Sequence, residues 1–135
     1  AKHNFSTAAE QGYTFSLKTP TGADSGAKLT ILGELSPTVK AYSRKKFAEY
    51  QQRQVMLKRK GKEDEQISLE EAEEMAVENA LVRLVSWEGV TDDGKEVKFS
   101  KEKAREVLTN HNWVREQITS ESQDVLNFQP ATLKV

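Results

Sequence analysis

The chain has 135 residues, no cysteine and a formal net charge of −1, with 36% apolar and 30% charged residues. This length predicts one domain with a modest core, and the lack of thiols excludes disulfides and thiolate metal sites. Every apolar run falls far short of the roughly 20 residues that span a bilayer, so we expect a cytoplasmic protein without a membrane partner.

The small net charge hides two opposed blocks. Residues 40–62 hold nine basic side chains against Glu49 alone, a net of +8, and residues 63–78 hold eight acids and no base, a net of −8. Blocks of this kind attract one another within a fold or between copies of it. The sequence favours neither arrangement over the other.

Residues 1–12 predict a flexible N-terminal segment, because they are small and polar apart from Phe5. Residues 13–17 alternate with the period of a strand, and residues 29–33 form a second β-prone run after a loop rich in glycine. Together they predict a β-hairpin over 13–34. A hairpin alone is marginal in water, so it must pack on the helices or on another chain.

A helix is predicted from Ser36-Pro37, a capping serine followed by the proline that suits a first helical position. It should run to about Lys60 and end at Gly61, with residues 61–67 returning the next helix antiparallel to it. One face collects most of its apolar residues, and we expect that face to meet the core. That face comprises Val39, Ala41, Tyr42, Phe47, Tyr50, Gln54 and Leu57.

Residues 68–99 are expected to form the central part of the fold, around which the other elements pack. Ser68 and Glu71 have the spacing of a capping box that opens a helix over 69–87. This helix is apolar almost all round between Leu81 and Val85, so its second half should be buried on several sides. Gly89 ends it, and Asp93-Gly94 predicts a tight turn.

Two more helices complete the chain. Ser100 caps the first, from Lys101 to about Asn110, and the second runs roughly from Trp113 to Asn127. The predicted fold class is mainly α with a small β part, an N-terminal β-hairpin packed on a bundle of about four helices. We expect a single domain over 13–128, helical over 36–128, and a C-terminal tail over 129–135.

The sequence offers no catalytic, cofactor-binding or metal-binding set, so we expect no enzyme and no cofactor. The two histidines, His3 and His111, lie in a predicted flexible segment and at a helix junction, and they offer no nucleophile–base pair. The acids cluster at a helix start, where they match the helix dipole. No phosphate-binding or dinucleotide fingerprint is present.

Four aromatic residues stand at the ends of predicted elements: Trp87, Phe99, Trp113 and Phe128. The favoured interpretation is that they fill the core where helices meet. The alternative is that some of them anchor a partner protein, a role in which aromatic residues are enriched. Phe128 is the best candidate for such a client-binding anchor.

A nucleic-acid interpretation rests on the basic helix within 40–62, where Tyr42, Phe47 and Tyr50 lie among the cations. Against it, these aromatic residues fall on the face that periodicity assigns to the core. The neighbouring acidic block would also repel phosphates. A small nucleic-acid-binding or regulatory protein is therefore the alternative and not the main prediction.

The order of motifs resembles the tail assembly chaperones of long-tailed, lambda-like, non-contractile bacteriophages over about residues 13–128. The most distinctive part is Trp-Glu-Gly-Val followed by the Asp-Gly turn and Phe-Ser. The motifs are LTILGE at 29–34, SP at 36–37, LVSWEGV at 84–90, DGK at 93–95, FS at 99–100 and the helix from Trp113 to Phe128.

This resemblance implies a non-enzymatic protein of the host cytoplasm that is absent from the mature virion. Such chaperones bind and solubilise the helical tape measure protein and help to recruit major tail protein subunits. Head-to-tail oligomers need two different complementary patches on each copy, which the charge blocks can supply. The residues expected in self-association are Lys45, Lys46, Arg53 and Arg59 against Glu70, Glu73 and Glu74.

Overall fold

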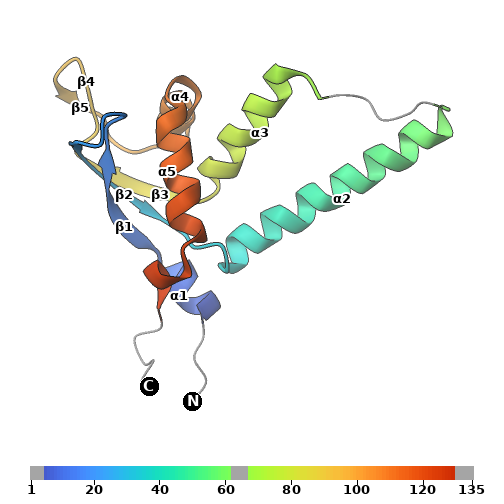
Figure 1. Cartoon of the computed structure of the whole chain (residues 1–135), viewed down its shortest axis with the longest axis horizontal. Coiled ribbons are helices and arrows are strands. Elements are labelled where there is room, and N and C mark those ends of the chain that lie inside the picture. Colours follow the sequence, from blue (N-terminus) through green and yellow to red (C-terminus); the bar gives the residue numbers. More distant parts are fainter. Residues whose placement is uncertain (1–4, 62–66, 130–135) are drawn as a thin grey trace.

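The computed structural model describes residues 5–61 and 67–129, and Figure 1 shows a small sheet beside a group of helices. The predicted fold class, mainly α with an N-terminal β-hairpin, is confirmed. The elements are α1 (Phe5–Gln11), β1 (Tyr13–Lys18), β2 (Asp24–Ile31), α2 (Pro37–Arg59), α3 (Leu69–Leu81), β3 (Leu84–Glu88), β4 (Thr91–Asp92), β5 (Lys95–Glu96), α4 (Lys101–Asn110), α5 (Asn112–Gln123) and the 3-10 helix η1 (Val125–Phe128).

The predicted hairpin is formed by β1 and β2, which pair antiparallel with Tyr13 opposite Ile31 and Phe15 opposite Leu29. Strand alternation turns Phe15, Leu17, Leu29 and Ile31 into the core, where each is at most 7% exposed. The hairpin thus packs on the helices of its own chain.

The helix predicted over 69–87 is wrong in its last part. α3 ends at Leu81, and β3 adds a third strand beside β2, in the order β1-β2-β3. Leu84 lies opposite Ile31 and Trp87 opposite Leu29. The run looked apolar on every side because helical periodicity gives way to strand alternation at this point, and valine and tryptophan favour strands.

The predicted turn at Asp93-Gly94 is confirmed: both residues have positive φ, 51° and 76°, between the short strands β4 and β5. Gly89 follows β3 with a φ of 75°, and a Cβ there would lie only 2.4 Å from the Gly26 carbonyl oxygen. A side chain at Gly89 would therefore push the end of β3 away from the hairpin.

One core lies between the sheet and the helices α3, α4 and α5. Its buried apolar members include Leu29, Ile31, Leu84, Leu108 and Ile118, each at most 1% exposed. The predicted caps are confirmed, since the side chains of Ser36, Ser68 and Ser100 accept hydrogen bonds from the N–H groups of Val39, Glu71 and Lys103. In the described part of the chain, no helix is both long and apolar enough to cross a membrane.

Residues 5–11 correct the prediction of a flexible segment over 1–12, because they form the helix α1; residues 1–4 lie outside the described part. Ala8 and Ala9 are buried, and the Ala9 carbonyl accepts a 3.0 Å hydrogen bond from the Gly33 N–H. A Cβ on Gly33 would come within 2.9 Å of Ala9 and Phe128. This contact is made by small residues, which do not produce the hydrophobic periodicity by which a helix is recognised in a sequence.

The last predicted helix is divided in the structure. α5 ends at Gln123, and Asp124 caps η1 by accepting a 3.0 Å hydrogen bond from the Leu126 N–H. The core continues into η1 through Phe128. Of the predicted tail over 129–135, Gln129 is described and residues 130–135 are not.

Candidate protein-interaction surface

α2 extends away from the sheet and from α4 and α5 (Figure 1). Its 23 residues make a helix roughly 35 Å long. Val39 near its start and Leu57 near its end are its buried residues. We call α2 together with residues 67–78, which include most of α3, the arm.

The arm exposes large apolar side chains, so the prediction that α2 turns its apolar face to the core is confirmed for Val39 and Leu57 and is wrong for Phe47 and Tyr50. Phe47 is 62% exposed and Tyr50 is 57% exposed. Periodicity shows which residues share a face of a helix, and it does not show whether another element covers that face. The other exposed apolar side chains of the arm are Val55, Met56, Ile67, Leu69 and Met75.

The start of α2 is held by α1. The Glu10 carboxylate accepts hydrogen bonds from the Ser36 hydroxyl at 2.7 Å, the Thr38 hydroxyl at 2.9 Å and the Thr38 N–H at 3.2 Å. The hydrogen bond from Ser36 is the main cause that lowers the pKa of Glu10 below 4.5. A carboxylate at a helix N-terminus also suits the helix dipole. This contact fixes the direction in which α2 extends away from α1 and the sheet.

A groove of about 420 Å³ runs between α2 and α3 along the arm. Three apolar side chains line it, Tyr50, Ile67 and Met75, and all three are largely exposed. The charged residues along its sides are Lys46, Glu49, Arg53, Glu71, Glu74 and Glu78. A groove that combines apolar and charged side chains on both walls is a surface that can accept an amphipathic helix.

Two ion pairs cross the groove. Lys46 Nζ lies 3.2 Å from Glu78 Oε2, and Arg53 lies 3.5 Å from Glu71 Oε2. The hydrogen bonds to Glu78 and then to Glu49 raise the pKa of Lys46. Their side chains remain 39–51% exposed, so each pair stabilises the arm by at most about 1 kcal/mol. The two helices are therefore tied loosely and can exchange these partners for others.

The residues predicted for self-association fall into two groups. Lys46 and Arg53 have partners inside the molecule. Within residues 5–61 and 67–129, the others form no ion pair: Lys45, Arg59, Glu70, Glu73 and Glu74. In the same ranges, no three acidic or histidine side chains are placed to hold a metal ion.

Phe128, proposed from the sequence as a client anchor, lies in the core and is 4% exposed. Its ring meets Tyr13 edge-on with centroids 5.8 Å apart, and it covers the space above Gly33. The side chain is already desolvated by its own chain, so it presents no surface to a partner. Trp87, Phe99 and Trp113 likewise pack against the core.

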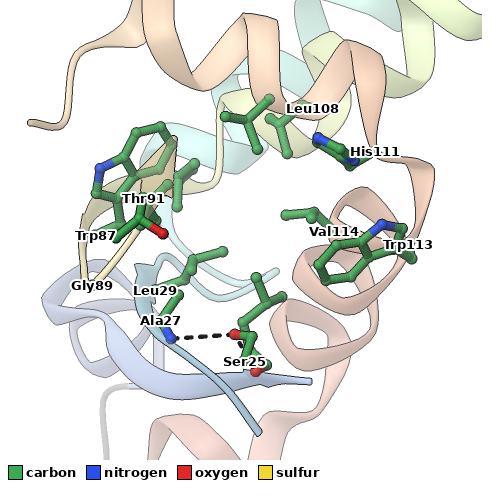
Figure 2. A pocket seen from close by; sticks show the side chains of 14 residues that line it. Ser25, Ala27, Leu29, Trp87, Gly89, Thr91, Leu108, His111, Trp113 and Val114 are labelled. Atoms are coloured by element: carbon green, nitrogen blue, oxygen red, sulfur yellow. Dashed lines mark hydrogen bonds between the residues drawn. The ribbon is translucent and has the colours of Figure 1, made fainter. Parts of the chain in front are cut away.

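A second hollow lies between the sheet and the junction of α4 and α5, and Figure 2 shows the side chains around it. It holds about 190 Å³, less than the roughly 300 Å³ at which ligand pockets usually begin. Its lining is mainly apolar and includes Trp87 and Trp113. The Ser25 hydroxyl beside it is occupied, donating to the Leu17 carbonyl at 2.6 Å and accepting from the Ala27 N–H at 3.2 Å.

Arg83 joins three elements beside the root of the arm, and sequence reasoning missed it. Its guanidinium, 2% exposed, binds both carboxylate oxygens of Glu34 at 2.6 and 2.9 Å and the Ser122 hydroxyl at 3.1 Å. It also binds the Asn79 side chain at 2.9 Å. The only signal in the sequence was a lone base inside the apolar run 80–85.

Lys101 is a second structural cation that sequence reasoning missed; the residue as a whole is exposed, but its ammonium is engaged by the backbone. Its ammonium donates to the carbonyls of Leu81 at 2.9 Å and Leu84 at 2.7 Å, where α3 gives way to β3. Leu81 is the last residue of α3, and a cation suits a helix C-terminus, where carbonyls lack helical partners. Burial lowers the pKa of Lys101.

A family model described as YdaY prophage protein matches residues 40–134. The match begins in the first turn of α2 and takes in the rest of the arm, β3, α4 and α5. No curated protein and no solved structure matches the chain.

Proposed function

The chain belongs to the YdaY prophage protein family and is phage-derived, and we propose that it is a tail assembly chaperone. In this proposal it is not an enzyme, it works in the host cytoplasm and it is absent from the mature virion. It binds the tape measure protein, keeps this long helical client soluble, and helps to recruit major tail protein subunits. The phage origin and the resemblance of the motifs over 13–128 both support this role.

The observation that carries the proposal is the exposed apolar surface of the arm. Large apolar side chains that cluster on a surface mark sites of protein interaction. Here three of them, Tyr50, Ile67 and Met75, line a groove between two helices, and they stand among charges that keep the free protein soluble. A chaperone needs both properties, because it must be soluble before it meets an insoluble client.

A helical client can be held by this groove without further chemistry. An amphipathic helix places its apolar stripe in such a groove and adds its own flanking charges to those of the walls. Each contact is weak, but a long client offers many segments, and several bound copies together gain avidity. The proposal therefore also includes self-association, through the charges of the arm that have no partner within the described residues.

Co-expression with a fragment of the tape measure protein tests the proposal. The chain should keep the fragment in the soluble fraction. The triple variant Phe47→Ser, Tyr50→Ser and Met75→Ser should weaken client binding about a hundredfold and leave most of the fragment insoluble, because burying each apolar side chain stabilises the complex by about 1 kcal/mol.

A matched control comes from three apolar residues that are exposed outside the arm, Val85, Val125 and Leu126. Changing these three to serine also removes exposed apolar surface, from smaller side chains, and should leave the client soluble. An insoluble client in the presence of the unchanged chain would contradict the proposed function. Equal effects of the two triple variants on client solubility would show that the arm is not the client-binding site.

Nucleic-acid binding is the second candidate, and the basic outer surface of α2 favours it. Lys40, Arg44, Lys45, Lys58 and Arg59 are all exposed in the structure. An electrophoretic shift assay over a salt series separates the two functions. Tight binding that weakens steeply with salt, with a slope set by the number of phosphates contacted, would favour this candidate.

A further inference from the structure

The two walls of the arm groove differ in charge. The α3 wall is acidic throughout, with Glu71, Glu74 and Glu78. The α2 wall carries Lys46 and Arg53, and Glu49 is its single acid. The apolar residues belong to the same two walls, Tyr50 to α2 and Met75 to α3, so that a helix in the groove meets acids along one flank and mainly bases along the other.

We propose that this groove binds an amphipathic helix in one direction only, and that charge selects the direction. The bound helix carries basic residues on the flank that faces α3 and acidic residues on the flank that faces α2. This inference rests on the proposed function, to which it adds the charge pattern and the polarity of the client segment.

The reason is geometric. Turning a helix end for end while its apolar stripe stays in the groove exchanges its two flanks. A client with one basic and one acidic flank therefore meets complementary walls in one direction and like charges in the other. Like-charge contacts at an interface reject the wrong arrangement, which makes charge a means of selecting register and direction.

The charges of the groove are available for this selection. Glu74 forms no ion pair within the described residues, and the side chains of the two crossing pairs are at least 39% exposed. A client helix can replace Lys46 as the partner of Glu78 and Arg53 as the partner of Glu71. Each exposed pair changes an equilibrium by about twofold, so that three pairs multiply to a directional preference of about tenfold.

Cross-linking can measure the direction, because the chain has no cysteine of its own. Ser43→Cys places a thiol near the root of α2, and Gln54→Cys places one roughly 16 Å further along the same side of the helix. The probe is a designed helical peptide with a leucine stripe, lysines along one flank, glutamates along the other and one N-terminal cysteine. A second peptide of equal composition has its two flanks exchanged.

We expect each peptide to form a disulfide about tenfold faster with one of the two cysteine variants, and the preferred variant to differ between the two peptides. A third peptide, with lysine and glutamate mixed on both flanks, should show no preference. Inverting the walls with Lys46→Glu, Glu78→Lys, Arg53→Glu and Glu71→Arg keeps both ion pairs possible and should reverse each preference.

The directional claim is overturned if both charged peptides prefer the same cysteine variant, or if neither shows a preference while fluorescence anisotropy reports binding. These results leave the chaperone function standing, because co-expression measures client solubility without reference to direction. Absence of binding by all peptides, together with a client that the chain keeps soluble, would place the client outside the groove and would also overturn the claim.

Discussion

At the scale of residues, the arm depends on a few polar side chains at its root. The Arg83 guanidinium connects Glu34, which follows β2, with Ser122 of α5, and the Ser122 hydroxyl donates to the Leu32 carbonyl at 2.8 Å. This network sets the path of the segment that leads into α2. Within the described residues, no buried side-chain nitrogen or oxygen lacks a hydrogen-bond partner.

Replacing Arg83 should therefore destabilise the whole fold. Arg83→Met leaves the buried Ser122 hydroxyl short of a partner and Glu34 without its cation. We expect a loss of about 3 kcal/mol in the free energy of unfolding, measured by urea denaturation. Arg105→Met, at an exposed position of α4, should change the free energy by less than about 0.5 kcal/mol. Equal losses of unfolding free energy in the two variants would mean that the Arg83 network does not stabilise the fold.

Glu10 should make the stability of the arm root depend on pH. Its pKa is lowered from 4.5, so the folded state favours the charged carboxylate. Its stabilising contribution is full above the ordinary pKa of 4.5 and disappears as the pH falls through the lowered pKa. The difference in unfolding free energy between the unchanged chain and Glu10→Gln should thus be present at neutral pH and vanish in acid. A difference independent of pH would contradict this account.

At the scale of elements, the sequence correctly predicted the caps, turns and helix ends that depend on residues close together in the chain. The three serine caps, the Gly61 stop, the Asp93-Gly94 turn and the bounds of α4 follow from side chains that bond to their own backbone. The prediction from sequence failed where contacts with residues distant in the chain determine the secondary structure. The stretch 84–88 becomes a strand because β2 offers an edge to pair with, and α1 forms because Gly33 leaves room for Ala9.

The candidate site shows the same division. Periodicity placed Tyr50 and Leu57 on one face of α2, but it could not show that Tyr50 is left uncovered. Phe128 had the composition of an anchor, and only its position above Gly33 reveals it as core. The antiparallel charge blocks were visible in the sequence, whereas the particular pairs across the groove required the structure.

As an element, α2 should be less stable than the sheet that it leaves. It buries Val39 and Leu57, and its other contacts are weak and exposed. Amides of α2 between residues 44 and 54 should exchange with solvent at least about tenfold faster than those of β2 or α5. Hydrogen exchange with mass spectrometry measures this, and a helical client should slow the exchange of α2 selectively. Equal protection of α2 and β2 would show that the arm is not a loosely held element.

At the scale of the whole molecule, the charge blocks are partly satisfied within one copy. The internal pairs use Lys46 and Arg53, and this leaves Lys45 and Arg59 for contact with Glu70, Glu73 and Glu74 of another copy. Because basic and acidic patches lie on different helices of the arm, such contacts join unlike surfaces. Unlike surfaces generate rings or open chains of subunits, which suits a protein that coats a long client.

The double variant Lys45→Glu and Arg59→Glu should weaken self-association about tenfold at low salt, as measured by sedimentation. Lys95→Glu with Lys98→Glu makes the same change in net charge away from the arm and should leave the oligomers intact. Added salt should dissociate the unchanged chain, because exposed charges are screened. Identical sedimentation of the two double variants would contradict the proposed contact between copies through Lys45 and Arg59.

The central claim is that the arm groove holds the helical client. Titrating the isotopically labelled chain with a helical segment of the tape measure protein, followed by NMR, tests it most directly. We expect chemical-shift changes confined to residues 46–56 and 67–78, with the signals of both tryptophans unchanged because they line the other hollow. Shifts that centre on Trp87 and Trp113 and leave the arm unchanged would contradict it.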